Sequence, residues 1–317
     1  MSPQKRDLAV DLVIPVFNEA GVVEQTHARI RAVIDNLPYQ FTIYYVDDGS
    51  TDGTLAVLTS LGDERVQVLE LSRNFGHQAA LTAGLDAARG DIVITMDGDG
   101  QHPPEMIPQM LDLALQGYDV VQTQRVDDAE PASFKKWTSG LFYRLINVIS
   151  GTRILPGTAD FRAMSRRAVE ALKSMPEYHR FLRGMVSWIG FPTIILPYQP
   201  AERISGVSKY SMRKMFNLAM DAIFSFSLMP LYIGLSMGGL FLFLALVEMV
   251  YVLSFWVTGR TSNLAPGWSS LMFVILIVGG MLMVLLGFIG VYIGYIFQEV
   301  KHRPVYLVKK EHASHPK

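Results

Sequence analysis

Two long apolar runs near the C-terminal end constrain the fold of this chain more than any other feature of its sequence. Residues 228–257 contain one ionisable residue, Glu248, and residues 271–297 contain none. Each run exceeds the roughly 20 residues that a helix needs to cross the apolar core of a bilayer. A soluble helix of this length usually keeps a polar face. The runs therefore predict two membrane-spanning helices, with Glu248 either making a polar contact between helices or serving a function.

Basic residues flank both runs and predict their orientation. The connecting residues 258–270 contain a single basic residue, Arg260. Because Lys and Arg are enriched on the cytoplasmic side of membrane helices, both termini are expected in the cytoplasm and the short loop outside. The flanking basic residues are Arg203, Lys209, Arg213 and Lys214 before the first run, and Lys301, Arg303, Lys309 and Lys310 after the second.

The stretch just before the first apolar run has an amphipathic helical pattern. Apolar side chains from Met212 to Phe226 recur at helical spacing, while Arg213, Lys214 and Asp221 lie off that face. Such a helix either packs on its own domain or lies in the membrane interface. Its position favours the interface, so we expect juxtamembrane helices over 208–227, two membrane helices with a short external loop over 228–297, and a cytoplasmic tail over 298–317.

The first part of the chain alternates short apolar strands with helices. Because this pattern is typical of a parallel, doubly wound sheet, residues 1–207 are predicted to form one α/β domain. The charged residues Lys5, Arg6, Asp7 and Asp11 argue against a signal peptide, so the domain is expected to stay at the cytoplasmic face of the inner membrane. Strands are expected at 12–16, 41–46, 66–71, 92–96 and from 120, and helices at 19–37, 51–61, 77–88, 104–115, 133–149 and 165–173.

Charge and cysteine content exclude several classes of function. The formal net charge is −1, which gives no sign of a nucleic-acid partner. The sequence contains no cysteine, which excludes a disulfide framework, a cysteine nucleophile and a thiolate metal site. A metal ion in this protein would have to be held by oxygen or histidine ligands.

Two acidic strings follow predicted strands and are expected at the same sheet edge, where ligands bind in such folds. Asp47 and Asp48, in VDDGSTD, are suited to a ribose or a base edge, although the same residues are common in a turn that caps a helix. Asp97 and Asp99, in DGDGQHPPE, can attract a hard divalent cation. A departing diphosphate needs such a cation to neutralise its charge.

These strings belong to a longer ordered set of motifs. The others are PVFNE at 15–19, SRNFGHQAAL at 72–81, GTADFRAMSR at 157–166 and GVSKYS at 206–211. Together they resemble family 2 glycosyltransferases of the polyprenyl-phosphate type, which are related to dolichol-phosphate mannose synthase. The nearest pattern is that of the bacterial polyprenyl-phosphate glucosyltransferases with two membrane spans. The chain departs from the family at Gly98 and Gly100, where Ala and Leu are usual.

The resemblance implies a GT-A (Rossmann-like) fold and inverting transfer of one sugar from a nucleotide sugar to polyprenyl phosphate. It suggests UDP-glucose as the donor, undecaprenyl phosphate as the acceptor and Mg²⁺ or Mn²⁺ as the cofactor. It also suggests a homo-oligomer, possible as a tetramer, in which Gly290 and Gly294 are candidates for a helix-packing contact. The alternatives are a GDP-mannose-dependent mannose synthase and a nucleotide-binding subunit without activity. A processive synthase is disfavoured, because the region around Trp188 has no QxxRW string.

Site roles follow from the resemblance position by position. Asp97 would face the ribose or sugar phosphate and Asp99 would bind the metal, so both are candidate metal ligands and catalytic residues, together with Asp160 in the TADFR string. The residues expected to hold the nucleotide sugar are Pro15, Asn18, Glu19, Asp47, Asp48, Asp97 and Gln101. Those expected to hold the lipid phosphate are Arg125, Arg162, Arg203, Ser208 and Lys209. Without the family resemblance, a surface ion pair would be the favoured interpretation of each arginine.

The chemistry of the acceptor adds one expectation. The second pKa of a phosphate monoester is near 6, so at neutral pH the group is largely a dianion and already a nucleophile. Asp160 is therefore expected to be an orienting or weakly basic group rather than an obligatory proton acceptor. Cations that place the dianion beside the donor are the greater need.

Overall fold

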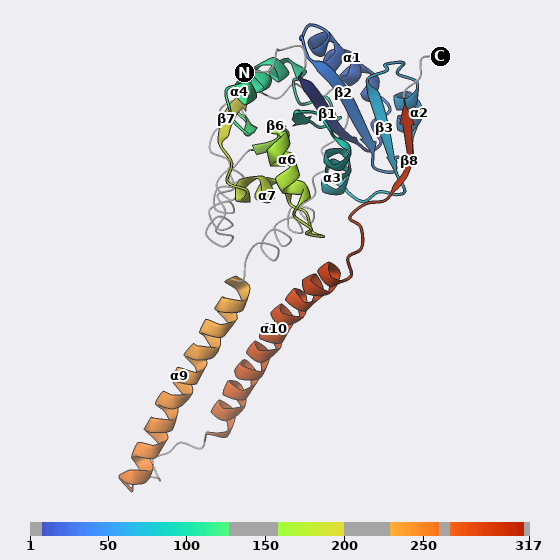
Figure 1. The fold of residues 1–317 in the computed structure, drawn as a ribbon. Coiled ribbons are helices and arrows are strands. Elements are labelled where there is room, and N and C mark those ends of the chain that lie inside the picture. Colours follow the sequence, from blue (N-terminus) through green and yellow to red (C-terminus); the bar gives the residue numbers. More distant parts are fainter. Residues whose placement is uncertain (1–7, 127–157, 200–228, 260–266, 314–317) are drawn as a thin grey trace. The chain divides into compact units, whose positions relative to one another are not determined.

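The computed structural model describes residues 8–126, 158–199, 229–259 and 267–313 (Figure 1). The chain divides into two compact units, and each is described by itself. The first contains the sheet and its helices and includes the described C-terminal residues from Arg303, and the second contains the described residues from Met229 to His302. The expected helices at 133–149 and 208–226, and the residues Arg203, Ser208 and Lys209, lie outside the described residues.

An eight-stranded mixed sheet forms the first unit, in the order β7-β5-β6-β4-β1-β2-β3-β8. The run β4-β1-β2-β3 is parallel, as the apolar strands of the N-terminal half predict. The central strand β1 is buried along almost its whole length because helices cover both faces of the sheet. The strands are β1 (Ala9–Val16), β2 (Gln40–Asp47), β3 (Val66–Leu71), β4 (Ile92–Thr95), β5 (Val120–Arg125), β6 (Thr158–Ser165), β7 (Thr193–Tyr198) and β8 (Val308–Ala313).

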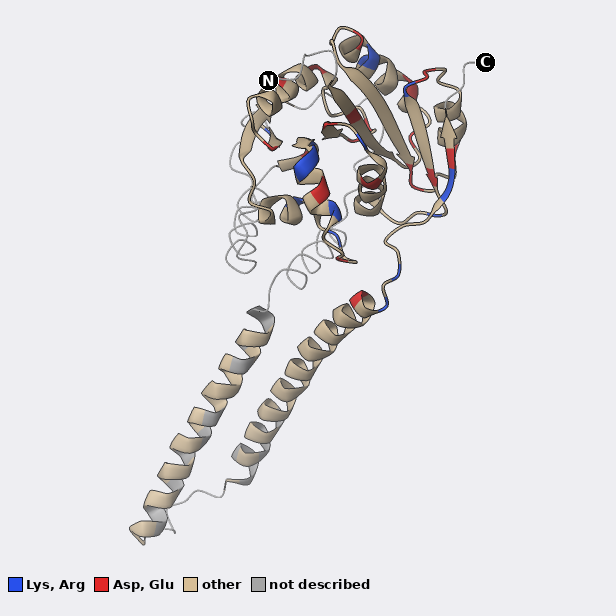
Figure 2. Cartoon of the chain, viewed as in Figure 1, with Lys and Arg blue, Asp and Glu red and all other residues tan. Residues whose placement is uncertain are grey.

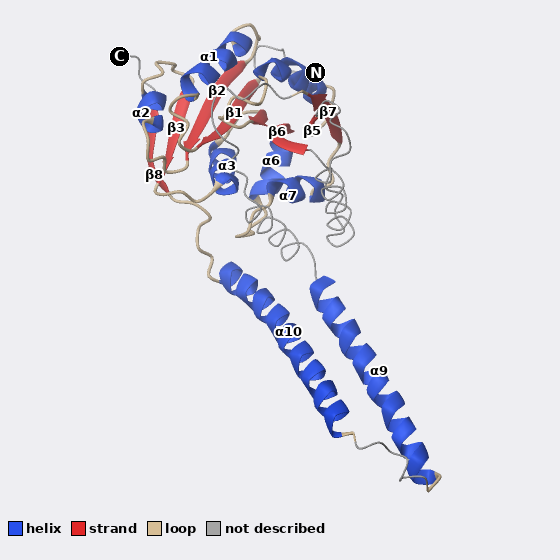
Figure 3. Ribbon diagram, turned by 180° about the vertical axis from the view of Figure 1, so that it is seen from behind, coloured by secondary structure: helices blue, strands red, loops and turns tan. Residues whose placement is uncertain are grey.

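Helices pack on the two faces of this sheet (Figure 3). Apolar residues of α1, α2 and α4 join the main core with the central strands. On the other side, Ala80 and Ala83 of α3 pack with Val46 and Leu69. The helices are α1 (Val23–Ile34), α2 (Thr54–Thr59), α3 (His77–Ala87), the 3₁₀ turn η1 (Pro104–Met106), α4 (Ile107–Leu115), α6 (Arg166–Lys173) and α7 (Leu182–Trp188).

The outer strands correct two expectations. The sheet is not wholly parallel, because β6 runs antiparallel between β4 and β5. The C-terminal residues are not merely a tail, because β8 pairs antiparallel with β3 and completes the sheet. Edge strands are partly exposed to water and can carry polar residues. The sequence VKKEHA of β8 therefore has too few apolar residues for its pattern to predict a strand. The domain boundary at 207 therefore leaves out one strand of the sheet.

The second unit contains two long helices, α9 (Met229–Val257) and α10 (Trp268–Val300). Within α10, Ile277–Val300 is long and apolar enough to cross a membrane, and it is the one such helix among the described residues. Apart from Glu299, α10 has no charged residue, whereas charges are scattered over the sheet unit (Figure 2). The two helices touch where a Cβ on Gly234 would meet Leu285. Of the two predicted membrane helices, the second therefore corresponds to a helix that is long and apolar enough to cross a membrane.

Candidate active site

The first acidic string ties two loops together at the carboxyl edge of the sheet. Asp48 follows β2, and its two carboxylate oxygens accept hydrogen bonds from the backbone N–H groups of Phe75 (2.7 Å) and Gly76 (2.9 Å). Asp47 accepts one from the N–H of Ser50 at 3.2 Å. Burial raises the pKa of both carboxyls, although these N–H donors oppose that effect. Asp48 therefore holds the loop that follows β3, and Asp47 holds the turn of its own string.

Position 49, directly after Asp48, requires a glycine. Gly49 has φ +67°, in the region where a side chain is strained, and a Cβ on it would lie 2.5 Å from the backbone carbon of Arg73. The two backbones can approach this closely only without a side chain at position 49.

The PVFNE motif lies beside the first string. Asn18 adopts φ +54°, its side chain accepts a hydrogen bond from the N–H of Thr51 (2.8 Å), and its own N–H donates to the hydroxyl of Ser50 (3.0 Å). The N–H of Glu19 donates to the hydroxyl of Thr54 at 2.9 Å. Pro15 is near the end of β1, in register with Val46 of β2. The structure thus brings together five of the seven residues expected to hold the nucleotide sugar, and that role stays a prediction.

The second acidic string presents its carboxylates to side chains instead. Asp97 Oδ1 lies 2.8 Å from His77 Nε2, and Asp97 Oδ2 lies 3.6 Å from His102 Nε2. Gly98 packs tightly beneath it, because a Cβ there would lie 2.5 Å from Val16. The two oxygens of Asp99 accept hydrogen bonds from the N–H (3.0 Å) and the side-chain amide (2.6 Å) of Gln101.

Electrostatics keep Asp97 ionised. Burial opposes its charge, but His102 and His77 outweigh burial and hold the pKa of Asp97 below its ordinary value. Burial would likewise lower the pKa of His77, but the hydrogen bond to Asp97 prevails and raises it to about 9. At neutral pH the pair is therefore a carboxylate and an imidazolium, in contact at the edge of the site.

Asp160 of β6 lies next to His77, in a cluster with two arginines. Its side chain is 3% exposed. Oδ1 lies 2.5 Å from Arg162 Nη2, and Oδ2 lies 2.9 Å from Arg183 Nη2. Arg183 Nε and Gln78 Nε2 also donate to the carboxylate, at 3.2 and 3.4 Å. Burial opposes its charge, but Arg183 and Arg162 outweigh burial and hold the pKa of Asp160 far below its ordinary value.

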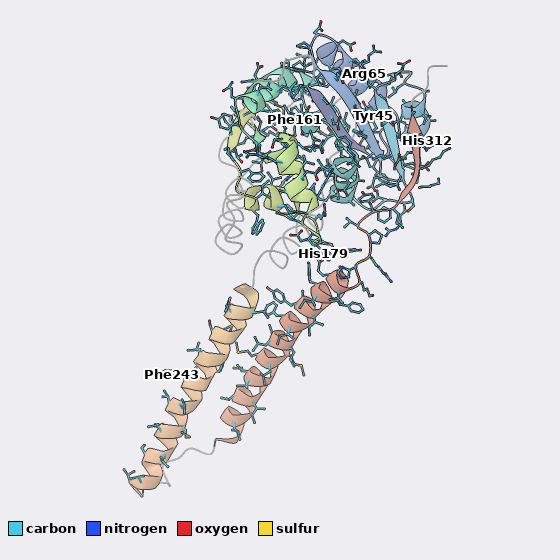
Figure 4. All side chains as sticks on the ribbon, in the orientation of Figure 1. Tyr45, Arg65, Phe161, His179, Phe243 and His312 are labelled. Atoms are coloured by element: carbon cyan, nitrogen blue, oxygen red, sulfur yellow. The ribbon has the colours of Figure 1, made fainter. Side chains whose placement is uncertain are left out.

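His77 links the two acidic groups, since its Nδ1 lies 3.9 Å from Asp160 Oδ2. The imidazole of His102 stacks on the ring of Phe161, with centroids 5.0 Å apart, which fixes it beside Asp97. Phe161 lies within the sheet unit (Figure 4). Arg125 ends β5 and is exposed, and its charge acts on Tyr198. Arg162 is also at the site, where its side chain is buried against Asp160, and its role toward the lipid phosphate stays a prediction.

Sequence reasoning missed four residues of this site: His77, Gln78, His102 and Arg183. The first three stand inside the motifs that carry the family resemblance, so their place in SRNFGHQ and DGDGQH was the available signal. Arg183 is in α7, within a stretch without clear periodicity, and no local pattern connects it with Asp160, 23 residues earlier in the sequence.

The donor atoms of the second string fit a divalent cation that arrives with a diphosphate. Among the described residues no three His, Asp or Glu side chains are grouped as a complete protein metal site. Mg²⁺ needs less from a protein, because one or two carboxylates suffice when substrate phosphates and water complete its shell. Asp99 is partly exposed and is oriented by Gln101 in the same loop, so its carboxylate is suited to that role.

Comparison with known proteins decides the family. The profile described as Glycosyl transferase family 2 matches residues 11–173. The chain belongs to this family. The SfII prophage-derived bactoprenol glucosyl transferase of Shigella flexneri is 38% identical over 314 residues, covering 98% of this chain and 100% of that protein. An uncharacterized glycosyltransferase of Bacillus subtilis is 39% identical over 316 residues, covering 97% and 95%.

One further relative and one solved structure are similar to this glycosyltransferase. A prophage bactoprenol glucosyl transferase homolog of Escherichia coli is 37% identical over 308 residues, covering 96% of this chain and 99% of that protein. A crystal structure of a mycobacterial protein superposes with a TM-score of 0.50 at 18% identity, covering 68% of this chain and 73% of that one. The latter likeness concerns the fold alone.

Proposed function

We propose that this glycosyltransferase transfers one glucose, with inversion, from UDP-glucose to polyprenyl phosphate, most simply undecaprenyl phosphate, at the cytoplasmic face of the membrane. The observation that carries the proposal is the similarity along the whole chain to proteins named bactoprenol glucosyl transferase, which extends beyond the sheet into the two long helices α9 and α10. The site supports it, because two acidic strings and an arginine-rich cluster meet at one edge of the sheet.

The donor would lie along the two acidic strings. Asn18, Asp47 and the loop fixed by Asp48 would surround the nucleoside, and Asp97 would face the ribose or the sugar phosphate. Asp99, oriented by Gln101, would hold Mg²⁺ or Mn²⁺. When bound, the cation would supply neutralisation of the charge on the departing diphosphate.

The acceptor would need placement more than activation. Its phosphate is largely a dianion at neutral pH and can attack the anomeric carbon without losing a proton. Asp160 is a poor proton acceptor, because the arginines beside it hold its pKa far below neutrality. In our proposal Asp160 therefore orients its neighbours, and the chain's cations place the dianion in line with the leaving group.

The path of the chain supports a membrane hairpin made of α9 and α10. The chain leaves the sheet domain after β7 and returns to it in β8, which pairs with β3. If one folded domain lies on one side of a membrane, the segment between these strands must cross that membrane an even number of times. A crossing by Ile277–Val300 then requires a partner, and α9 is the other long helix among the described residues. The basic residues around both helices support a cytoplasmic sheet domain.

A transfer assay tests the proposal directly. Purified protein in detergent receives a short polyprenyl phosphate, Mg²⁺ or Mn²⁺, and one radiolabelled UDP- or GDP-sugar at a time. We expect label in the organic phase with UDP-glucose, and loss of that label when the cation is chelated. Label from GDP-mannose instead would replace the donor and keep the reaction class. No transfer from any donor, with folded protein, would favour a subunit without activity.

A further inference from the structure

Arg29 of α1 reaches the loop that carries Asp99. This loop, residues 97–102 (the Asp99 loop), follows β4 and leads to η1. Arg29 Nη1 donates a hydrogen bond to the backbone carbonyl oxygen of Gly100 at 3.2 Å, and Nη2 lies 3.3 Å from each carboxylate oxygen of Glu105 in η1. The guanidinium therefore ties both the loop and η1 to α1, and it contacts the loop at the residue that follows Asp99.

A different contact fixes the two ends of the Asp99 loop. The N–H of Asp97 donates to His102 Nδ1 at 2.9 Å, and the imidazole stacks on Phe161 of β6. Between these ends, Asp99 accepts its hydrogen bonds from Gln101, which is part of the same loop. Those bonds orient the carboxylate relative to its own loop, whereas the bond from Arg29 holds the middle of the loop against another element of the domain.

The middle of the loop needs such a support because it contains a glycine in an unusual conformation. Gly100 has φ +76° and is buried. Glycine has access to more backbone conformations than other residues, so holding it in one of them costs more entropy. A hydrogen bond from a charged guanidinium opposes that freedom more strongly than one from a neutral donor. Glu105 pairs with the same guanidinium and keeps it directed at the loop.

We propose that Arg29 is a positioning residue, which holds the Asp99 loop in the geometry that binds a divalent cation together with the diphosphate of the donor. The assignment rests on the proposed function, in which Asp99 supplies a carboxylate to that cation. A cation whose shell is completed by substrate phosphates has few protein ligands, so the place of each one matters. Groups that orient a metal ligand without touching the metal typically change metal affinity by about 10–100-fold when they are removed. Arg29 acts in this way through the backbone of Gly100.

The competing interpretation is that Arg29 only stabilises the packing of α1 on η1. The variants Arg29→Gln and Arg29→Lys, each made alone and with Asp99→Asn, separate the two roles, because an effect exerted through Asp99 disappears once that carboxylate is removed. Arg31→Gln is the matched control, since Arg31 is on the same helix and pairs with Asp35 and Asp63 instead. Thermal unfolding of each variant shows whether it is folded.

The first readout is equilibrium binding of UDP with and without Mn²⁺, which involves no turnover. We expect Mn²⁺ to tighten the binding of UDP to wild type, because the cation neutralises the diphosphate. Arg29→Gln should lose about tenfold of that tightening, with metal-free binding of UDP within about twofold of wild type. Arg29→Lys should keep part of the tightening, and Arg31→Gln should keep it all. In the Asp99→Asn background, Arg29→Gln should have no further effect.

Three results would overturn the proposal. The first is a tightening by Mn²⁺ that Arg29→Gln leaves unchanged, and the second is an equal loss of UDP binding with and without Mn²⁺. The third is a further loss when Arg29→Gln is added to Asp99→Asn. A wild type whose binding of both UDP and GDP is indifferent to Mn²⁺ would overturn it as well.

The second readout is kinetic and keeps this assignment apart from the proposed function. Arg29→Gln should raise the Mn²⁺ concentration for half-maximal transfer about tenfold, with kcat at saturating Mn²⁺ and KM for polyprenyl phosphate within about twofold of wild type. A lower kcat with an unchanged Mn²⁺ requirement would refute the assignment and leave the proposed function standing. A wild type that binds UDP more tightly with Mn²⁺ but transfers no sugar to polyprenyl phosphate would refute the proposed function and leave this assignment standing.

Discussion

The two acidic strings look alike in sequence and differ in what their carboxylates do. Each follows a strand of the parallel run and places two aspartates beside glycine. In the first string, Asp48 is nearly fully buried and receives backbone N–H groups on both oxygens. In the second, Asp97 is 32% exposed and contacts imidazoles, while Asp99 contacts Gln101. The first string stabilises the loops around the site, and the carboxylates of the second lie within the site.

The difference shows how two motifs of similar composition can take separate roles. Backbone donors are fixed by the fold, so a carboxylate that satisfies them is committed to architecture. Side-chain donors can turn away when a ligand arrives. Burial accordingly raises the pKa of Asp48, whereas the imidazoles hold the pKa of Asp97 below its ordinary value. Substitutions in the first string should therefore mainly lower stability, and substitutions in the second should mainly lower activity.

The largest effect is expected at Asp99. Asp99→Asn should lower metal-dependent transfer by roughly 10²–10³-fold, because it removes the carboxylate proposed to hold the cation. The thermal unfolding midpoint should stay near that of wild type, because the hydrogen bonds of this carboxylate run to Gln101, a neighbour in the same loop. Transfer measured across a Mg²⁺ and Mn²⁺ titration, beside thermal unfolding, checks both parts. Wild-type activity in this variant would remove Asp99 from the metal site.

The next largest effect is expected at Gly49, in the first acidic string. Gly49→Ala should destabilise the sheet domain by roughly 3 kcal/mol, because it adds a clash with the Arg73 backbone to an unfavourable positive φ. Gly117→Ala is the matched control, since Gly117 also has positive φ but has open space around it, and roughly 1 kcal/mol is expected there. Denaturant unfolding compares them, and equal losses would mean that the close approach to Arg73 contributes nothing.

Asp48→Ala should cost roughly 2 kcal/mol of stability, since the buried N–H groups of Phe75 and Gly76 lose a charged acceptor. The loop that begins α3 should loosen, so KM for the nucleotide sugar should rise as well. Asp48→Asn keeps one carbonyl acceptor, so its stability should lie between those of wild type and Asp48→Ala. If Asp48→Ala raised KM without any loss of stability, Asp48 would belong with the ligand-contacting carboxylates, and the contrast between the strings would fail.

The sequence predicts the centre of this fold better than its edges. The strands β1 to β4 and the start of α3 at His77 follow from buried apolar runs, whose pattern is strong because both faces of the strands are covered. The strands β6, β7 and β8 carry mixed or polar residues and owe their place to pairing with distant strands. The site follows the same rule, because the aspartates stand in local motifs whereas the contact between Arg183 and Asp160 exists only in the folded chain.

The smallest effect is expected where the C-terminal strand braces the first string from outside. Leu307 O accepts a hydrogen bond from the N–H of Ser72, at the start of the loop that Asp48 holds. Nearby, Glu70 of β3 lies 2.5 Å from Lys309 Nζ and 3.0 Å from His312 Nε2, both in β8, and faces Asp47 across the pairing with β2. Hydrogen bonds from Lys309 and His312 lower the pKa of Glu70.

The sign of the pH effect follows from that lowered pKa. The stabilisation by Glu70 is fully present above its unfolded pKa, about 4.5, and is lost as pH falls from there through the lower folded value. Because Lys309 is largely exposed, we expect no more than about 1 kcal/mol at pH 7. Glu70→Gln should therefore lower the thermal midpoint at pH 7 and approach wild type only as the pH falls below the folded pKa of Glu70, while Glu64→Gln at an exposed position should leave the midpoint unchanged. A Glu70→Gln deficit that persisted unchanged at acid pH would show that packing, rather than charge, holds the strand in place.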